Sequence, residues 1–124
     1  MKRQSGFTLI ELVMVIVILG ILGAIATPIF VDLESDALTA AKKGMSGAVK
    51  AAHAVAIADM KSFPEVGELA TYVQGENVAA VGTGIQVDIN GTNYVVPTYT
   101  DQNCTAGNET GNTTDVVNCV GNIP

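Results

Sequence analysis

The hydrophobic pattern divides the chain into an apolar first part, an amphipathic second part and a more polar remainder. From Leu12 to Val31 there is no charged residue, and this length can cross a hydrocarbon layer of about 30 Å as a helix. Helix-favouring sequence continues to about Ser62 and stops at Pro64, because proline cannot extend the helical hydrogen-bond ladder. The pattern therefore predicts one long helix over about residues 7–62.

The second part of this predicted helix carries a stripe of mainly small apolar residues. They recur at three- and four-residue spacing, which places them on one helix face, while the lysines fall away from it: Leu33, Ala37, Ala41, Gly44, Ala48, Ala51, Ala52 and Val55. Small side chains let another layer of backbone approach closely. We interpret the stripe as the helix face that packs on a sheet.

After Pro64 the pattern changes to strands and turns. Residues 65–73 are compatible with a short connecting helix, whereas 75–84 have no clear period. Alternating apolar residues at 85–89, the dipeptide Asn90-Gly91 and a second apolar run together predict a β-hairpin.

Pro97 follows the second hairpin strand, and we expect it to end that strand or confine it to a sheet edge. A third strand is expected near Val116-Val117. The predicted fold class is α+β, with the long helix packed on a small antiparallel sheet and a disulfide-closed C-terminal region.

The charge distribution indicates an exported chain whose N-terminal apolar segment lies in the membrane. The 124 residues carry twelve acidic and six basic side chains, with a net charge of −6. Lys2 and Arg3 precede the apolar segment, while Asp32, Glu34 and Asp36 follow it. The positive-inside bias then places the start of the chain in the cytoplasm and the residues after the segment outside. Nucleic-acid binding by a basic face is not indicated.

The two cysteines, Cys104 and Cys119, enclose a stretch rich in Asn, Thr and Gly. In an exported chain a disulfide is the economical interpretation, and closing such a loop stabilises a small domain by about 3 kcal/mol in the entropy model. Two free thiols or half of a metal site are the alternatives. The spacing matches no zinc pattern, so no metal is expected.

The sequence offers no catalytic constellation. There is one histidine, His53, for which solvation or packing is the simplest interpretation, and there is no Gly-rich phosphate loop or nucleophile elbow. No catalytic residue and no cofactor is expected. Four Asn-X-Thr triplets could accept a glycan, but such triplets arise by chance in a tail of this composition: Asn90, Asn103, Asn108 and Asn112.

A short string at the start of the apolar segment is the most informative motif. The residues Gly6-Phe7-Thr8-Leu9-Ile10-Glu11 carry a carboxylate into the membrane, where an unpaired charge costs a few kcal/mol, so Glu11 should have a partner. The string resembles the type III signal of type IV prepilins. The resemblance implies that residues 1–6 form a leader, that a prepilin peptidase cuts between Gly6 and Phe7, and that the new Phe7 amine is methylated.

Cleavage would create a cation at Phe7 close to the Glu11 carboxylate. In a stack of subunits the amine of one chain can meet Glu11 of the next and set axial register, because a buried ion pair penalises every mispaired neighbour. The alternative is that Glu11 only marks the membrane boundary. In the pilin family the helix between residues matching Gly20 and Pro28 loses order in assembled filaments; a simple kink is the alternative here.

The resemblance covers about a quarter of the chain, and within the family it looks most like type IVa pilins of the mannose-sensitive haemagglutinin type. It implies three segments: the leader, a membrane and filament-core helix at 7–31, and a periplasmic or extracellular domain at 32–124. The implied function is a structural pilus subunit for adhesion, motility or DNA uptake. Its partners would be other pilin subunits, the prepilin peptidase, the membrane and the inner-membrane assembly machinery.

Such a subunit would reside in the bacterial inner membrane before assembly and in an extracellular pilus afterwards. Two other functions stay open. A type II secretion pseudopilin shares the same N-terminus. The second alternative function is a soluble secreted binding protein cleaved after Ala26, because Ala24-Ile25-Ala26 fits a small-residue cleavage site. The carboxylate of Glu11 inside the apolar stretch argues against this last alternative.

Overall fold

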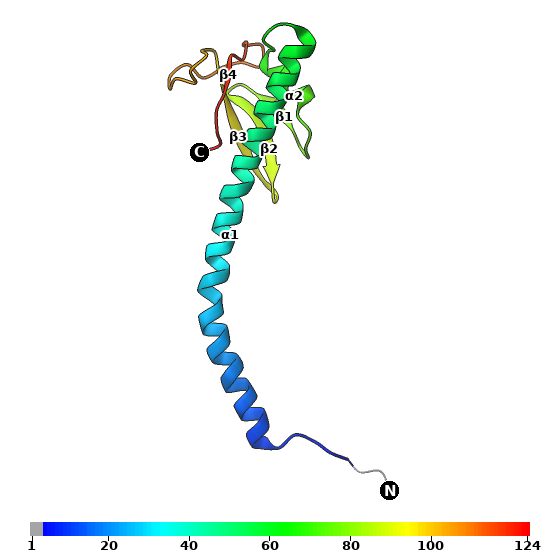
Figure 1. Cartoon of the computed structure of the whole chain (residues 1–124), viewed down its shortest axis with the longest axis vertical. Helices are drawn as coiled ribbons and strands as arrows, with labels where there is room; N and C mark the ends of the chain where they lie inside the picture. Colours follow the sequence, from blue (N-terminus) through cyan, green and yellow to red (C-terminus); the bar gives the residue numbers. More distant parts are fainter. Residues whose placement is uncertain (1–3) are drawn as a thin grey trace. The chain divides into compact units, whose positions relative to one another are not determined.

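The computed structural model describes residues 4–124; Met1, Lys2 and Arg3, which belong to the expected leader, lie outside the described residues. The chain forms two compact units, one up to Ala37 and one from Leu38 to Pro124. A long helix, α1, runs through Leu9–Met60 and contributes to both. It is followed by a short helix and four strands (Figure 1).

Helix α1 confirms the predicted long helix. It begins slightly later and ends slightly earlier than expected. It is continuous through Pro28, whose missing N–H deprives the preceding turn of one hydrogen bond. The hydroxyl of Thr27 donates to the carbonyl of Gly23 at 2.7 Å in the same turn. Lys61 adopts a left-handed backbone, with φ of 56°, and this ends the helix just before Pro64.

In the first unit the apolar side chains of α1 are exposed, with Leu9 80% and Ile16 57% accessible. By length and composition this helix is sufficient to cross a membrane. An apolar surface of this kind is unfavourable in water, and this unit offers no buried core of its own among the described residues.

The second unit contains an antiparallel sheet with the strand order β1-β2-β3-β4. The strands span Ala79–Val81, Gly84–Ile89, Thr92–Tyr99 and Cys119–Val120. The predicted hairpin is confirmed: Ile89 pairs with Thr92 across Asn90 and Gly91, whose φ values of 54° and 79° suit a two-residue type I′ turn. Helix α2, Val66–Tyr72, is the expected connecting helix.

The structure corrects two strand expectations. Pro97 neither ends β3 nor confines it to an edge, because the strand continues to Tyr99 and β4 pairs with its last two residues. Pro97 lies opposite Gly84, and its own carbonyl accepts from the amide of Gly121 at 2.8 Å. The third expected strand is Cys119–Val120, whereas Val116 makes only an isolated bridge with Glu65.

The core lies between the second part of α1, helix α2 and the sheet. Its fully buried side chains come from every layer: Val49, Val66, Leu69, Ile85, Val87, Val96 and Val117. In Figure 1 the strands β2 and β3 lie beside the part of α1 that contributes Val49.

The predicted packing face of α1 is wrong by part of a turn. The buried positions are Ser46, Val49, Ala52 and Ala56, so only Ala52 of the predicted stripe is buried and Ala41 is partly covered. The other stripe residues are exposed: Leu33, Ala37, Gly44, Ala48, Ala51 and Val55. The buried face thus combines one valine and two alanines with Ser46, whose hydroxyl oxygen accepts a hydrogen bond from the amide of Ile123.

The C-terminal region is closed by the expected disulfide between Cys104 and Cys119, whose Cα atoms lie 5.4 Å apart. The hydroxyls of Thr98 and Thr110 are both buried and form a hydrogen bond of 2.6 Å. The amide of Val117 donates to the carbonyl of Pro64 at 2.8 Å. These contacts attach a segment with little apolar content to the sheet and to the start of α2.

Candidate processing and assembly site

The start of α1 is held by a reciprocal pair of hydrogen bonds between Thr8 and Glu11. The amide of Thr8 donates to Glu11 Oε2 at 2.9 Å, and the amide of Glu11 donates to Thr8 Oγ1 at 3.3 Å. This is a capping box, in which an N-cap Thr and a Glu three residues later satisfy each other's free amides. It explains why the helix begins at Leu9.

The capping box gives Glu11 a local partner that the sequence expectations did not include. The signal was present, since Thr-X-X-Glu precedes an apolar run in the sequence. Within a single chain the carboxylate is therefore already hydrogen-bonded, and a negative charge in the first turn of a helix also interacts favourably with the helix dipole. The intermolecular register role of Glu11 and Phe7 stays a prediction.

Gly6 and Phe7 lie immediately before this helix start and are exposed, with 90% of Phe7 accessible. A Cβ added to Gly6 would meet nothing within 4 Å, and Gly6 does not have a left-handed backbone. The fold therefore does not require glycine at this position. The peptide bond between the two residues is sterically open, as a peptidase would need.

Gly20 and Pro28 both lie inside the continuous part of α1. A Cβ on Gly20 would also meet nothing within 4 Å, so no contact among the described residues explains the glycine. Glycine weakens a helix by about 1 kcal/mol relative to alanine, and the proline removes one backbone hydrogen bond, so the two residues weaken this stretch of the helix. Its loss of order in a filament remains a prediction.

Among the described residues, no buried side-chain nitrogen or oxygen lacks a hydrogen-bond partner. His53 Nε2 lies 2.8 Å from the carbonyl oxygen of Val117, and the ring packs against Phe63, which agrees with a packing role. A hydrogen bond to Asp59 raises the pKa of Tyr72. Within residues 4–124 there is no group of three His, Cys, Asp or Glu that could hold a metal ion.

Comparisons with known proteins agree with the motif. Residues 1–27 match the family described as the prokaryotic N-terminal methylation motif. The type IV narrow pilus major component PilA5 of Thermus thermophilus is 52% identical over 62 residues, which cover 50% of this chain and 53% of that protein. Fimbrial protein Q of Moraxella bovis is 40% identical over 84 residues, or 68% of this chain and 52% of that protein.

The type II secretion system core protein G of Pseudomonas aeruginosa is 45% identical over 51 residues, which cover 41% of this chain and 36% of that protein. The chain spans about half the length of the first two relatives. No solved structure matches significantly. The methylation motif and the relatives named as pilus and fimbrial proteins support the identification of this chain as a type IV pilin.

Proposed function

We propose that this chain is the structural subunit of a type IV pilus, polymerising through its N-terminal helix into surface filaments for adhesion, motility or DNA uptake. The observation that carries the proposal is the junction at the start of α1. There an open Gly6–Phe7 bond directly precedes a capped helix, and the large apolar side chains of its first part are exposed within the described structure. Such a surface requires lipid or other copies of the same helix.

Processing would divide the chain into the leader at 1–6, a membrane and filament-core helix at 7–31 and an exported domain at 32–124. The prepilin peptidase would cut after Gly6, and methylation would keep the positive charge of the Phe7 amine. That amine would then meet Glu11 of a neighbouring subunit. Because Thr8 already donates to one Glu11 oxygen, Oε2, the second oxygen remains available for the neighbour.

Before assembly the subunit would reside in the bacterial inner membrane, with α1 in lipid. The assembly machinery would then extract it, and the helix would exchange lipid for the helices of neighbouring subunits. Both surroundings are apolar, so the free-energy difference between them is small compared with transfer to water. The assembly machinery can therefore drive the growth of the filament. The assembled filament would lie outside the cell.

A pseudopilin of a type II secretion system is the second candidate, because the relative from Pseudomonas aeruginosa is named as a core protein of that system. The two functions predict different phenotypes. Deletion of a pilin removes surface fibres and leaves protein secretion intact. Deletion of a pseudopilin blocks secretion of folded enzymes and leaves long fibres in place.

Intact mass spectrometry of the protein from its host, together with electron microscopy of labelled fibres, tests the proposal. We expect a mature chain that starts at methylated Phe7 and is incorporated in fibres. Gly6→Leu should abolish this start, whereas the control Ser5→Ala should preserve it. A mature chain starting at Thr27 would contradict the pilin function and support a secreted soluble protein.

A further inference from the structure

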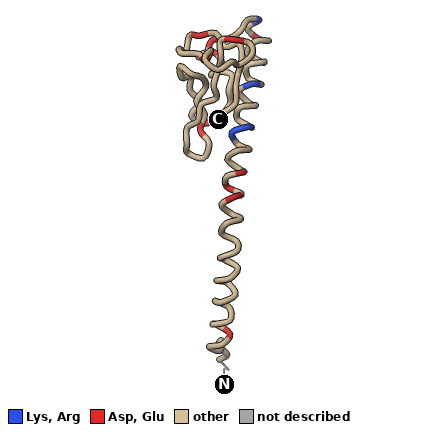
Figure 2. The backbone as a smooth tube through the Cα atoms, turned by 90° about the vertical axis from the view of Figure 1, so that its left-hand side faces the viewer, with Lys and Arg blue, Asp and Glu red and all other residues tan. Residues whose placement is uncertain are grey.

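The basic residues of the second unit lie on α1 or at its end, whereas its acidic residues, apart from Asp59, lie after α1. All four lysines after the leader lie between positions 42 and 61, whereas residues 62–124 contain seven acidic residues and no basic one. Figure 2 shows this separation: within the described residues, blue is confined to α1 and its end, and the loops of the second unit carry only red. Such a distribution is unfavourable for binding a uniformly charged partner.

The positive side of the second unit is a row that we name the basic flank, formed by Lys43, Lys50 and Lys61. Lys43 and Lys50 are seven residues apart on α1, and this spacing places them on the same side of the helix. All three are exposed. Lys50 donates to the side-chain oxygen of Asn122 at 2.7 Å, and this partner is uncharged, so the contact leaves the lysine charge unneutralised.

The negative side is the loop between β3 and β4, and we name its three carboxylates, Asp101, Glu109 and Asp115, the acidic loop. Each carboxylate accepts backbone amides of its own loop: Thr105 to Asp101 at 3.1 Å, Gly107 to Glu109 at 2.9 Å and Gly111 to Asp115 at 2.8 Å. These bonds hold the three carboxylates in place, and the hydrogen bond from the Thr105 hydroxyl lowers the pKa of Asp101. The acidic loop is therefore an anionic surface whose carboxylates are positioned by hydrogen bonds within the loop.

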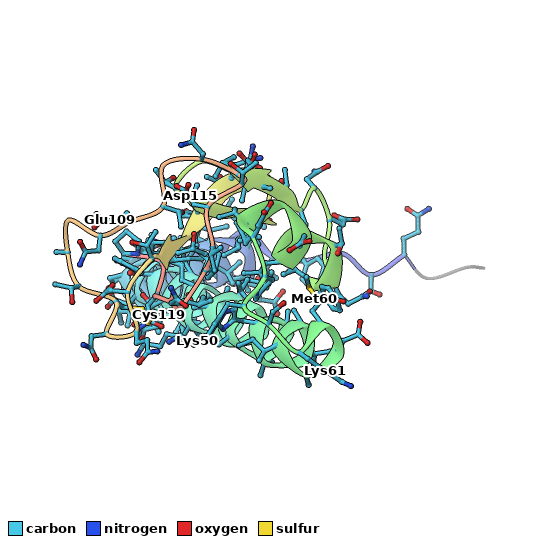
Figure 3. All side chains as sticks on the ribbon, turned by 90° about the horizontal axis from the view of Figure 1, so that it is seen from above. Lys50, Met60, Lys61, Glu109, Asp115 and Cys119 are labelled. Atoms are coloured by element: carbon cyan, nitrogen blue, oxygen red, sulfur yellow. A yellow bond between two sulfur atoms is a disulfide. The ribbon has the colours of Figure 1, made fainter. Side chains whose placement is uncertain are left out.

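The basic flank and the acidic loop lie on different sides of the second unit. Figure 3 looks down on this unit and shows Lys50 and Lys61 along one side, with Glu109 and Asp115 on the other. Two patches of opposite charge on different sides of one molecule cannot neutralise each other within that molecule. They can do so between two molecules.

A second copy of this chain fits these surfaces better than other partners, because each copy presents both halves of the contact. The contact would be heterologous, with a different patch on each partner, and a repeated heterologous contact that does not close produces an open helical assembly. Charge complementarity of this kind supplies orientation and register more than affinity. These are the properties that the exported domains of a filament require.

We propose that the basic flank of one subunit binds the acidic loop of a neighbouring subunit in the filament. The proposal rests on the proposed pilus function and adds the contact between the exported domains. The small residues beside the flank are consistent with it, because a Cβ on Gly44 or Gly47 would meet nothing within 4 Å, so the partner can approach the helix backbone there.

The direct test is zero-length carbodiimide cross-linking of fibres made from the unaltered protein, followed by peptide mapping. The reagent joins a lysine to a carboxylate in contact with it. We expect links between peptides that carry Lys43 or Lys50 and peptides that carry Glu109 or Asp115, present in fibres and absent in detergent-dispersed single chains. Links of this kind that persist in single chains, or fibres without them, would overturn the proposal.

Charge reversal gives an independent test. Lys43→Glu and Glu109→Lys should each reduce the number of fibres about tenfold, because like charges then face each other, and the double variant should recover much of the loss. Glu76→Lys is the matched control, since Glu76 is exposed and lies outside the acidic loop. Equal fibre numbers in all four strains would refute the contact.

Two further outcomes separate the explanations. If the unaltered protein forms no fibres in its host, the pilus function fails, and the interface is refuted with it. If Lys43→Glu fibres are as numerous as unaltered ones but no longer bind double-stranded DNA on a column, the flank serves a nucleic acid, and the subunit contact is wrong.

Discussion

Ser46 Oγ accepts a hydrogen bond from the amide of Ile123 at 2.9 Å, although 77 residues separate them. The contact is one step of a short ladder along α1. Lys42 donates to the carbonyl of Pro124 at 3.2 Å, and Lys50 donates to the side chain of Asn122. The three helix positions are four residues apart and meet the last residues of the chain in reverse order, so this segment runs antiparallel along the helix.

The first prediction concerns this attachment. Ser46→Ala should lower the free energy of unfolding of the second unit by about 1–3 kcal/mol, because a buried amide loses its acceptor. Denaturant unfolding of the detergent-solubilised chain measures the change. Ser62→Ala is the matched control, since Ser62 is exposed. Equal stability of the two variants would show that the Ser46 hydroxyl is dispensable.

The second prediction separates the capping and register roles of Glu11. Glu11→Gln retains an oxygen for the Thr8 amide, so the helix should still begin at Leu9, but it removes the charge that the Phe7 amine would meet. Fibre numbers should therefore fall while membrane insertion and cleavage at Gly6 persist. Electron microscopy and the mass of the processed chain must be measured together, because reduced methylation would complicate the result.

Glu11→Val completes that comparison by removing the charge and the cap. Abundant fibres of a correctly processed Glu11→Val protein would contradict the register mechanism and leave Glu11 as a boundary residue. Fibres that fail with valine but form normally with glutamine would assign the residue to helix capping alone.

The third prediction concerns the disulfide. Cys104→Ser should destabilise the second unit by about 3 kcal/mol, because the unfolded chain regains the freedom of the open loop. Non-reducing peptide mapping of the unaltered protein should recover Cys104 linked to Cys119. Fibres should become scarce in the variant while α1 still inserts into the membrane. Free alkylation of both thiols in the native protein would show that the loop is ordered without the bond.

The fourth prediction compares two glycines of the same unit. Gly47→Ala should raise the free energy of unfolding by about 0.5–1 kcal/mol, because a Cβ there meets nothing within 4 Å. Gly84→Ala should lower it by about 1–3 kcal/mol, since its Cβ would collide with the backbone of Val96 in the paired strand. Thermal unfolding followed by circular dichroism checks both, and equal shifts would contradict the packing described.

Much of the fold could be predicted because its signals are local. The uncharged run before Val31 and the proline at 64 define the long helix, and Asn90-Gly91 defines the hairpin, since few residues adopt the left-handed turn that joins such strands. The disulfide followed from the isolation of two cysteines in a polar segment. None of these depends on how distant segments pack.

The packing face of α1 could not be predicted in the same way. Alanines and glycines surround much of the helix after Val31, so small apolar residues do not distinguish the buried side from the exposed one. Val49 and Ser46 determine the buried side through their contacts with the sheet and with Ile123, which lie far away in the sequence. The two-residue strand β4 is set by similar long-range pairing.

At the candidate site, the residues of the junction were identified from the motif, but the hydrogen bond between Thr8 and Glu11 was not. The charge of Glu11 in an apolar segment predicts an oppositely charged partner, such as the Phe7 amine of another chain. An uncharged amide in the same chain also satisfies the carboxylate, and only atomic positions reveal that it does.

The lengths of the outer strands have a consequence for solubility. The sheet ends at β1, with three residues, and at β4, with two. Because β1 pairs only with the first three residues of β2 and β4 only with the last two of β3, neither outer strand covers the rest of the hairpin. Long exposed edges invite sheet-to-sheet aggregation, and very short ones protect against it. Sheet-to-sheet association of this domain would therefore begin at the hairpin of β2 and β3, which the two short outer strands leave partly open.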